Sequence, residues 1–515
     1  MIAAAANLLW LASHSRALAR FRHQLEAPEK TQRQVLARLL RQNAGCAFGR
    51  RHGFADIRTP AEFASRVPLA NYADLEPWIR ELMRGERSVL TTEEPTHLVP
   101  TSGSTRARKL IPFTATLQRE FDAAIGPWIV DLFRTCPGAL FGPAYWSISP
   151  AIAPEREESA VPIGFADDTS YLGGVRRWIV GRALVSPDVR ELSADIEAFT
   201  LHTLACLLRR RDLRLISVWH PSFLLLLLDA LPGQWTRLLE LVRVGSGRAR
   251  EKELSRLGPN EPAKLWPNLK VISCWTDAHA ETGASDLAHR FPGVAIQPKG
   301  LLATEAFVTL PFGGAHPIAI GSHYFEFLDD RGTLHSANAL EVDHTYEVVV
   351  TTGGGLWRYR LGDRVRVDRF VGRTPSLRFV GRVGNVADFF GEKLSEEIVA
   401  GVIAQLRGDS SGEVRFAMLA PEVTPTTGAY VLFWEGTAPP SAAKLDSLLC
   451  ANPNYTWCRQ LGQLGPARVF AVESNASEVF LRRMSASGQR LGEIKISPLS
   501  RLTGWTAHFS GSIAE

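Results

Sequence analysis

The stretch "TTGGGLWRYRLGDRV" (Thr351–Val365) places three consecutive glycines before an alternating pattern of large side chains. Trp357, Tyr359 and Leu361 are separated by single arginines. Because successive side chains of a strand point to opposite faces, this alternation predicts a strand with two different faces. Gly362 then permits a turn. The stretch therefore predicts a strand-rich region that ends in a polar turn.

Asp363 directly follows that glycine. A carboxylate accepts two hydrogen bonds and suits the vicinal diol of a ribose. The alternative is an aspartate in an ordinary turn. Apolar or β-branched runs bounded by Pro and Gly predict further strands nearby. These runs are "LKVISCW" (269–275), "VAIQPKGLLATEAFVTLPF" (294–312), "HYFEFLD" (323–329) and "YEVVVTT" (346–352).

The N-terminal part of the chain, to about residue 95, has the pattern of helices. Leu8, Leu11 and Leu18 are expected on one helical face that packs on the body of the protein, so the apolar N-terminus is interpreted as a helix rather than as a signal peptide. The run "FLLLLLDAL" (223–231) is too short to cross a bilayer, which needs about 20 apolar residues, and predicts a buried helix.

The segment "TSGSTRARKLIPFT" (Thr101–Thr114) combines hydroxyl side chains and one glycine with the cations Arg106, Arg108 and Lys109. Strands are expected on both sides of it, and Thr114 is expected to cap the following helix. A Walker A loop would lead from a strand into a helix and would carry a second glycine before the lysine. We therefore expect a hairpin whose hydroxyl and N–H groups hold polyphosphate oxygens. A plain Ser/Thr/Gly turn is the alternative.

Bulk composition excludes several classes of protein. A length of 515 residues suggests two to four domains. The net charge of +5 is small, and no basic stripe with interleaved aromatic residues points to nucleic acid. The six cysteines form no C-x-x-C pair, which argues against a zinc site or a disulfide framework and indicates a reducing, cytoplasmic location.

A domain boundary is expected within "LRFVGRVGNVADFFGEKLSEEIV" (377–399), where glycines recur after a strand that ends near Val380. Ser395 can cap a helix whose first turn holds Glu396 and Glu397, which is favourable at the positive end of the helix dipole. Strand, strand, helix, strand and a polar tail are expected to follow. This pattern predicts a small α+β unit at the C-terminus.

Two further residues have the right chemistry for a nucleotide site. Glu305, in "ATEAF", follows a buried-looking strand, and its carboxylate could hold a Mg²⁺ ion that bridges phosphates. Lys495, in "GEIKISPLSR", could close over developing negative charge from a mobile small domain. A surface glutamate and a solvated lysine are the alternatives when each residue is taken alone.

The order of these pieces resembles that of the adenylate-forming superfamily. The segments "TSGSTRARKLIP", "IQPKGLLATEAF", "TTGGGLWRYRLGD" and "GRVGNVADFFGEKLSEE" together resemble the auxin-responsive acyl-acid amido synthetases of the indole-3-acetic acid/jasmonate type, including bacterial members. The resemblance implies an α/β fold. A large N-terminal domain (1–382), with β-barrel and α/β subdomains, would precede a small mobile α+β C-terminal domain (383–515).

The resemblance also implies roles for individual residues. Glu305 would bind Mg²⁺, Lys495 would promote adenylation, and Lys393 would stabilise the adenylate or help the second half-reaction. Arg106 departs from the family pattern, in which a glycine commonly follows the hydroxyl run. The ATP-binding residues would be Thr101, Ser102, Gly103, Ser104, Thr105, Lys109, Thr304, Tyr359, Asp363 and Arg382.

A small carboxylic acid and an amino acid would be the substrates, with no nucleic-acid or membrane partner. The acid is expected to contact Tyr145, Trp146, Trp275 and Leu301, although core packing accounts equally well for any one aromatic residue. His220 and His279 are candidate bases for the amine, with structural histidines as the alternative. An acyl-CoA ligase and a non-catalytic acyl- or nucleotide-binding protein are the rival interpretations.

Overall fold

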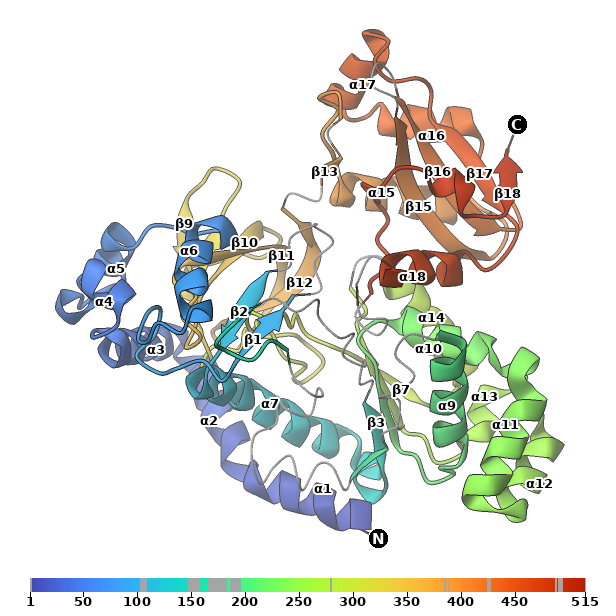
Figure 1. The fold of residues 1–515 in the computed structure, drawn as a ribbon, viewed down its shortest axis with the longest axis horizontal. Helices are drawn as coiled ribbons and strands as arrows, with labels where there is room; N and C mark the ends of the chain where they lie inside the picture. Colours follow the sequence, from blue (N-terminus) through green and yellow to red (C-terminus); the bar gives the residue numbers. More distant parts are fainter. Residues whose placement is uncertain are drawn as a thin grey trace.

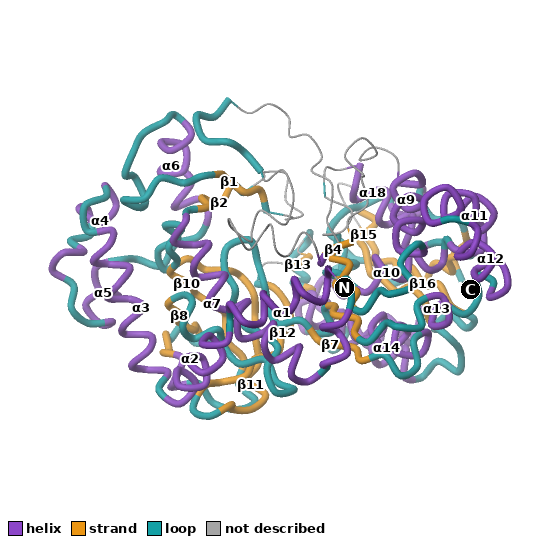
Figure 2. Tube along the Cα trace, turned by 90° about the horizontal axis from the view of Figure 1, so that it is seen from below, coloured by secondary structure: helices purple, strands orange, loops and turns teal. Residues whose placement is uncertain are grey.

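The protein is seen here in a computed structural model (Figure 1). It describes residues 2–101, 109–146, 158–164, 183–185, 196–277, 280–383, 386–387, 389–423, 428–486, 489 and 494–514. Figures 1 and 2 show the helices of residues 28–83 at one end of the molecule and the helices of residues 231–257 at the other. No helix in these ranges is both long and apolar enough to cross a membrane.

The N-terminal helices form an outer layer around the first part of the core. Proline or a polar cap begins several of them; the α6 helix, for example, starts with a capping box between Asn71 and Asp74. The elements are α1 (Ile2–Ser13), α2 (Ser15–Glu26), α3 (Pro28–Asn43), α4 (Ala47–Arg51), η1 (Phe54–Asp56), α5 (Pro60–Arg66) and α6 (Tyr72–Met83).

The expected apolar face at the N-terminus was only partly right. The helix breaks at His14, between α1 and α2, so the apolar spacing of α1 does not continue on the same face in α2. Within α1 the buried side is the one that carries Ala6, Asn7 and Trp10, so Leu8 is 52% exposed, whereas Leu18 in α2 is buried. Because α1 is apolar nearly all around, leucine spacing alone could not select its buried side.

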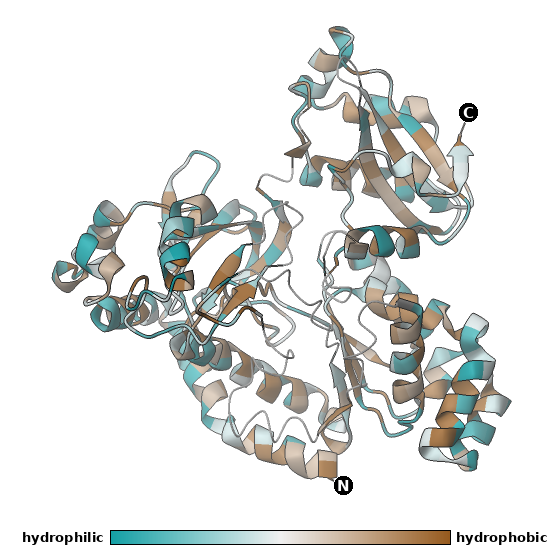
Figure 3. Cartoon of the chain, viewed as in Figure 1, coloured by the Kyte–Doolittle hydropathy of each residue, from teal (hydrophilic) through white to brown (hydrophobic). Residues whose placement is uncertain are grey.

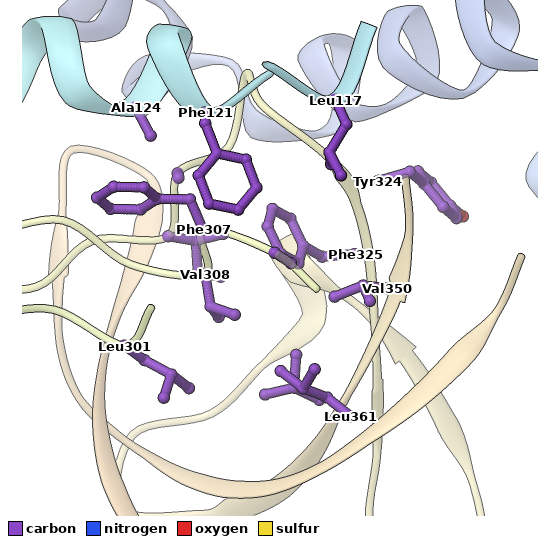
Figure 4. Packing of buried hydrophobic residues seen from close by; sticks show 14 of the residues in the cluster. Leu117, Phe121, Ala124, Leu301, Phe307, Val308, Tyr324, Phe325, Val350 and Leu361 are labelled. Atoms are coloured by element: carbon purple, nitrogen blue, oxygen red, sulfur yellow. The ribbon is translucent and has the colours of Figure 1, made fainter. Parts of the chain in front are cut away.

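A hairpin leads from this layer into the core. Strands β1 (His97–Pro100) and β2 (Leu110–Phe113) pair antiparallel, as the sequence predicts. Thr114 then caps α7 (Ala115–Thr135), because its side chain accepts a hydrogen bond from the Leu117 N–H. This helix covers a curled antiparallel sheet, and Figure 4 shows Leu117 and Phe121 among the side chains packed beneath it.

Within the described residues, the strands of this sheet follow the order β12-β11-β10-β8-β9. A bridge between Ser376 and Pro317 extends it beyond β12, so that it curls around an apolar interior. The strands are β8 (Tyr324–Leu328), β9 (Leu334–Ser336), β10 (Thr345–Thr351), β11 (Tyr359–Val371) and β12 (Thr374–Arg382), with η4 (Ala337–Ala339) between β9 and β10.

The three glycines of the quoted stretch allow this sheet to approach the hairpin and α7 closely. A Cβ at Gly353 would lie 2.4 Å from Cγ2 of Thr116, and one at Gly354 would lie 2.6 Å from the Pro112 oxygen. Both distances are too short for any side chain. The glycine run therefore decides how these elements fit together.

A second, parallel sheet has the order β4-β3-β5-β6-β7 within the described residues. Its strands are short apolar runs covered by helices, as in other parallel sheets. The apolar run at 223–231 forms buried helix α10, as predicted. The elements are η2 (Pro137–Phe141), β3 (Ala144–Trp146), β4 (Leu184–Val185), α9 (Ile196–Leu208), β5 (Leu215–Ser217), α10 (Pro221–Asp229), α11 (Leu231–Ser246), α12 (Arg248–Leu257), α13 (Pro262–Leu265), β6 (Val271–Cys274), α14 (Ala280–Arg290) and β7 (Ala295–Pro298).

The C-terminal part is an α+β unit whose sheet has the order β15-β16-β17-β18. Ser395 caps its first helix by accepting from the Ile398 N–H, as predicted. Figure 3 shows hydrophobic residues, coloured brown, along strands of this sheet. The elements are β13 (Val386–Ala387), β14 (Leu394–Ser395), α15 (Glu396–Gly408), β15 (Val414–Val423), β16 (Gly428–Gly436), α16 (Ala442–Leu449), α17 (Pro453–Gln460), β17 (Arg468–Val472), α18 (Ala476–Ala486), η6 (Trp505–Ala507) and β18 (Gly511–Ile513).

The expectation of a polar tail was wrong. The last residues form β18, which pairs with β17 at the edge of the sheet, and Trp505 is fully buried before it. An exposed edge strand of three residues has no apolar run that sequence periodicity could detect.

Candidate active site

The hairpin predicted to hold phosphates is closed at its base. The Thr101 N–H donates to the Lys109 carbonyl oxygen over 2.9 Å, next to the last strand pair, Pro100 and Leu110. The chain therefore leaves and returns as a hairpin, unlike a Walker A loop. Ser102, Gly103, Ser104, Thr105 and Arg106 lie outside the described residues, and their phosphate role stays a prediction.

Asp363 and Arg382 form an ion pair across two adjacent strands. They are register partners in β11 and β12, and Arg382 Nε lies 2.7 Å from Asp363 Oδ1. The Asp363 carboxylate is buried. Its charge is the largest cause of the raised pKa of the Arg382 guanidinium, which stays cationic. An anionic acceptor is thus fixed beside a permanent cation at the end of the curled sheet.

The expected turn at Gly362 is a bulge instead. The glycine has a φ of +79°, yet β11 continues through it to Val371. The pairing with β10 shifts register here, between Glu347 and Val349. A bulge of this kind leaves an extra residue unpaired and re-aims the neighbouring side chains, and Asp363 follows it directly. Local sequence could not distinguish the two, since both use a glycine with positive φ.

Glu305 lies at the tip of a tight turn. Leu302 and Phe307 form a bridge, and the Ala303 N–H donates to the Ala306 carbonyl oxygen over 3.0 Å, so Thr304 and Glu305 occupy the two central positions. Burial raises the pKa of Glu305; the charge of Arg382 and, less strongly, that of Lys109 oppose this shift, while Asp363 adds to it. These interactions join the turn electrostatically to the ion pair.

Lys109 connects the hairpin to the curled sheet. Its ammonium donates to the Tyr359 hydroxyl at 3.4 Å, and its Nζ lies 5.9 Å from the centre of the Tyr72 ring. Tyr359 is fully buried; burial, followed by the charge of Glu305, raises the pKa of its phenol, so it stays protonated. The structure therefore brings together Lys109, Glu305, Tyr359, Asp363 and Arg382, which we call the five-residue cluster.

The five-residue cluster could hold Mg²⁺ through a single protein carboxylate. Among the described residues, no group of three His, Cys, Asp or Glu side chains could hold a metal. Mg²⁺ in phosphate-transfer sites commonly keeps its waters and takes one or two carboxylates plus substrate phosphates. The buried Glu305 carboxylate could serve as such a single protein ligand.

The four residues expected to contact the acid do not share one environment. Tyr145 and Trp146 are neighbours in β3, so their side chains point to opposite faces. Tyr145 is buried in the core with α9 and α10, while Trp146 stacks on Trp128 with ring centres 6.1 Å apart and ring planes inclined by 25°. Leu301 is buried in the curled-sheet core (Figure 4). Core packing thus accounts for Tyr145 and Leu301.

Trp275 and Lys495 meet between the N-terminal and C-terminal parts of the chain. Lys495 Nζ lies 4.7 Å from the centre of the Trp275 ring, which follows β6 at the carboxyl edge of the parallel sheet. Ligands commonly bind at this edge of α/β sheets. Asp277, two residues on, accepts from the Phe379 N–H of β12 over 3.0 Å. Lys495 is therefore placed close to the strand that carries Arg382.

Lys393 lies on the C-terminal unit, where its carbonyl oxygen accepts from Asn452 Nδ2 over 3.2 Å. It is exposed and has a φ of +47°. The preceding Glu392 is fully buried and accepts from the N–H groups of Phe389 and Phe390 and from the Tyr430 hydroxyl. These contacts fix the loop on the C-terminal unit and leave the Lys393 ammonium at the surface.

Of the two candidate bases, His220 is part of the described structure and His279 is not. His220 caps α10: its Nδ1 accepts from the Ser222 N–H and lies 2.7 Å from the Ser222 hydroxyl. This geometry supports the structural interpretation. His279 lies outside the described residues.

One residue beside the cluster and one at the edge of the parallel sheet were missed from the sequence. Tyr72 accepts from the Leu110 N–H at the base of the hairpin, and no local pattern marks it. Lys299 follows β7, is almost fully buried, and places its Nζ 4.6 Å from the centre of the Trp219 ring. Its position directly after a strand of the parallel sheet was the available signal.

Known proteins resemble this chain over most of its length. Among curated relatives, the probable indole-3-acetic acid-amido synthetase GH3.12 of Oryza sativa subsp. japonica is 25% identical over 553 residues, covering 90% of each chain. The indole-3-acetic acid-amido synthetase GH3.17 of Arabidopsis thaliana is 25% identical over 554 residues, covering 91% of this chain and 90% of that protein.

Among solved structures, the AtGH3.15 acyl acid amido synthetase in complex with 2,4-DB matches with a TM-score of 0.82 at 19% identity, over 98% of each chain. This likeness establishes that the chain has the fold of that protein. Domain models of the GH3 family match in chain order: the N-terminal domain over residues 17–255, the central domain over 317–382 and the C-terminal domain over 396–503. Because these matches follow one another over most of the sequence, the chain belongs to the GH3 family.

Proposed function

We propose that the protein is an ATP-dependent acyl-acid amido synthetase. It activates a small carboxylic acid as an acyl adenylate with release of pyrophosphate, and then transfers the acyl group to the amine of an amino acid with release of AMP. The observation that carries this proposal is the five-residue cluster, which gathers cations, an acidic turn and a buried aspartate from separate stretches of the chain. Its GH3 relatives, which are named as amido synthetases, support the same reaction.

The first half-reaction requires two anions to meet. The acid's carboxylate attacks the α-phosphorus of ATP, forms a new O–P bond and displaces pyrophosphate. Lys109 offers positive charge to the phosphate groups, and Asp363, helped by its ion-pair partner Arg382, accepts from the ribose hydroxyls. Lys495 faces the charge that grows on the α-phosphoryl oxygens. Such preorganised contacts stabilise a transition state because they need no reorganisation during the reaction.

Mg²⁺ and the hydroxyl hairpin belong to the same half-reaction. When bound, Mg²⁺ would neutralise phosphate charge, with Glu305 as its protein ligand. Thr101, Thr304 and the Ser102–Thr105 loop would donate to phosphate oxygens. Removal of Mg²⁺ with EDTA should abolish pyrophosphate release, and added Mg²⁺ should restore it.

The second half-reaction forms the amide bond. The neutral amine attacks the acyl carbon, the bond to the AMP oxygen breaks, and AMP leaves with the electron pair. Lys393 would stabilise the departing AMP after the C-terminal unit reorients, and Trp146 and Trp275 would contact the acyl group. The residues 383–515 act as the lid domain on the larger unit 1–382, and the expected location is the cytoplasm.

A pyrophosphate-release screen tests the proposal. Aryl, indolyl and aliphatic acids are supplied with ATP, Mg²⁺ and mixed amino acids, and mass spectrometry identifies the products. We expect acid-dependent release and an acyl–amino acid conjugate. A thioester formed with coenzyme A in place of the amide would identify an acyl-CoA ligase, and no release with any acid would favour a binding protein.

Asp363→Ala should abolish pyrophosphate release, because the ribose loses its anionic acceptor. The matched control is Asp56→Ala, which removes an exposed aspartate from η1. Full activity in Asp363→Ala would refute the ribose role.

A further inference from the structure

Two ionisable residues are buried together under the candidate active site. Glu120 of α7 is 2% exposed and His323 is 0% exposed, and His323 Nδ1 lies 2.9 Å from Glu120 Oε2. Aromatic rings surround the imidazole, with the rings of Phe121 and Phe325 centred 5.8 and 5.9 Å away. Burying such groups in an apolar core destabilises the fold unless their polar atoms are paired.

The other nitrogen of the imidazole holds the Glu305 turn. The Phe307 N–H donates to His323 Nε2 over 3.0 Å, and Phe307 forms the bridge that closes this turn. Since Nε2 accepts, Nδ1 carries the proton and donates to the Glu120 carboxylate. His323 is thus held as one neutral tautomer between helix and turn.

The same carboxylate oxygen holds the glycine run. The Gly353 N–H donates to Glu120 Oε2 over 2.8 Å, and the Thr114 hydroxyl donates to the Gly353 carbonyl oxygen over 2.9 Å. Both backbone groups of Gly353 are therefore tied to α7. The segment that follows Gly353 leads to Tyr359 and Asp363.

The charge of the Glu120 carboxylate is balanced by Arg38, at the edge of the core. Arg38 Nη2 lies 3.6 Å from Glu120 Oε1, on the side of the carboxylate away from the imidazole. Arg38 is partly exposed, so its cation stays hydrated while it compensates the buried anion. These contacts form a continuous chain from Arg38 through Glu120 and His323 to Phe307, which we call the relay.

We propose that Glu120 and His323 are positioning residues for the nucleotide site. Their hydrogen bonds fix the Glu305 turn and the glycine run to the helix that directly follows the phosphate hairpin, so three ATP-binding segments share one buried anchor. The proposal rests on the proposed function, because it assigns the relay a role in placing Glu305 and Asp363 around ATP. Displacements below about 1 Å at such groups are enough to reduce catalysis.

The test compares three variants of α7 by the kcat and KM for ATP in pyrophosphate release, by ATP affinity in calorimetry, and by Tm. Glu120→Leu removes the acceptor, Glu120→Gln keeps an oxygen that can accept both N–H groups, and Leu132→Ala removes a buried side chain from the same helix without a polar contact. We expect Glu120→Leu to raise KM or lower kcat at least tenfold. Glu120→Gln should stay within about threefold of the parent protein, and Leu132→Ala should lower the Tm with kcat and KM nearly unchanged.

Equal kinetics in Glu120→Leu and Leu132→Ala, or a Glu120→Gln protein as impaired as Glu120→Leu, would overturn the positioning role. If Glu120→Leu does not fold, His323→Gln replaces it, since its amide oxygen can still accept from Phe307 while its link to Glu120 is lost. Unchanged kinetics and ATP affinity in His323→Gln would equally overturn the role. A parent protein that binds ATP but releases no pyrophosphate contradicts the proposed function alone. The ATP affinities of the variants, measured by calorimetry, then test the positioning role. A parent protein that does not bind ATP overturns both proposals.

Discussion

At the scale of single residues, Glu305 is a buried carboxylate whose charge its neighbours only partly compensate. Burial raises its pKa in spite of Arg382 and Lys109. A raised pKa in the folded state means that the group favours folding below its ordinary value of 4.5, and that this contribution is lost as the pH rises through the raised value. Near neutral pH the ion-free protein is thus destabilised by the buried Glu305 carboxylate, the proposed Mg²⁺ ligand.

Glu305→Gln should therefore stabilise the ion-free protein and inactivate it. We expect the free energy of unfolding at pH 7–8 to increase by roughly 0.5–2 kcal/mol, with a smaller gain near pH 5, and pyrophosphate release to be lost. Thermal unfolding across this pH range, together with the release assay, measures both effects. A variant that is less stable at pH 8 than the parent protein would contradict this account of the carboxylate.

At the scale of elements, the glycine run, the hairpin and α7 form one junction. Gly353→Ala would place a Cβ 2.4 Å from Thr116 Cγ2, so we expect a loss of about 1–3 kcal/mol in unfolding free energy. Gly401→Ala in α15 is the control: no atom lies within 4 Å of its added Cβ, and a helical alanine should stabilise by roughly 0.5–1 kcal/mol. Denaturant unfolding of both variants measures the difference. A neutral Gly353→Ala would show that the junction is looser than described.

Elements whose signals are local could be predicted from the sequence. The caps at Thr114 and Ser395 depend on residues within one turn, and the structure confirms them. The bulge at Gly362 and the edge strand β18 depend on pairing with distant strands, which periodicity does not encode. For the same reason the sequence indicated Asp363 and Glu305 individually, whereas the Glu120–His323 relay, from helix to turn, had no sequence signal.

At the scale of the whole molecule, the C-terminal unit meets the larger unit through ion pairs and through a buried apolar cluster that includes residues of α10 and α18. Arg364 of β11 bridges Asp330 and Glu397, which belong to the two units, at 2.8 and 3.2 Å. Exposed ion pairs of this kind contribute about 0–1 kcal/mol. The Lys495–Trp275 contact is a cation–π pair of similar strength. If the C-terminal unit reorients between the two half-reactions, as proposed, it has to exchange these polar contacts and separate the apolar contact between α10 and α18.

The two lysines of this unit should therefore affect different steps. Lys495→Ala should slow acid-dependent pyrophosphate release by about a hundredfold, while aminolysis of a supplied acyl adenylate continues. Lys393→Ala should show the reverse pattern. Lys444→Ala, which removes a half-exposed lysine paired with Asp409, is the control and should change neither rate. Equal losses in both steps for each variant would contradict the separate roles.

The convergence of the phosphate hairpin and Asp363 on one nucleotide is tested most directly by a crystal structure of the protein with ATP and Mg²⁺. The account predicts the ribose hydroxyls on the Asp363 carboxylate, the phosphates between the Thr101–Lys109 hairpin and the Glu305 turn, and the metal on Glu305. A nucleotide bound elsewhere, with its sugar or phosphates away from these segments, would contradict it.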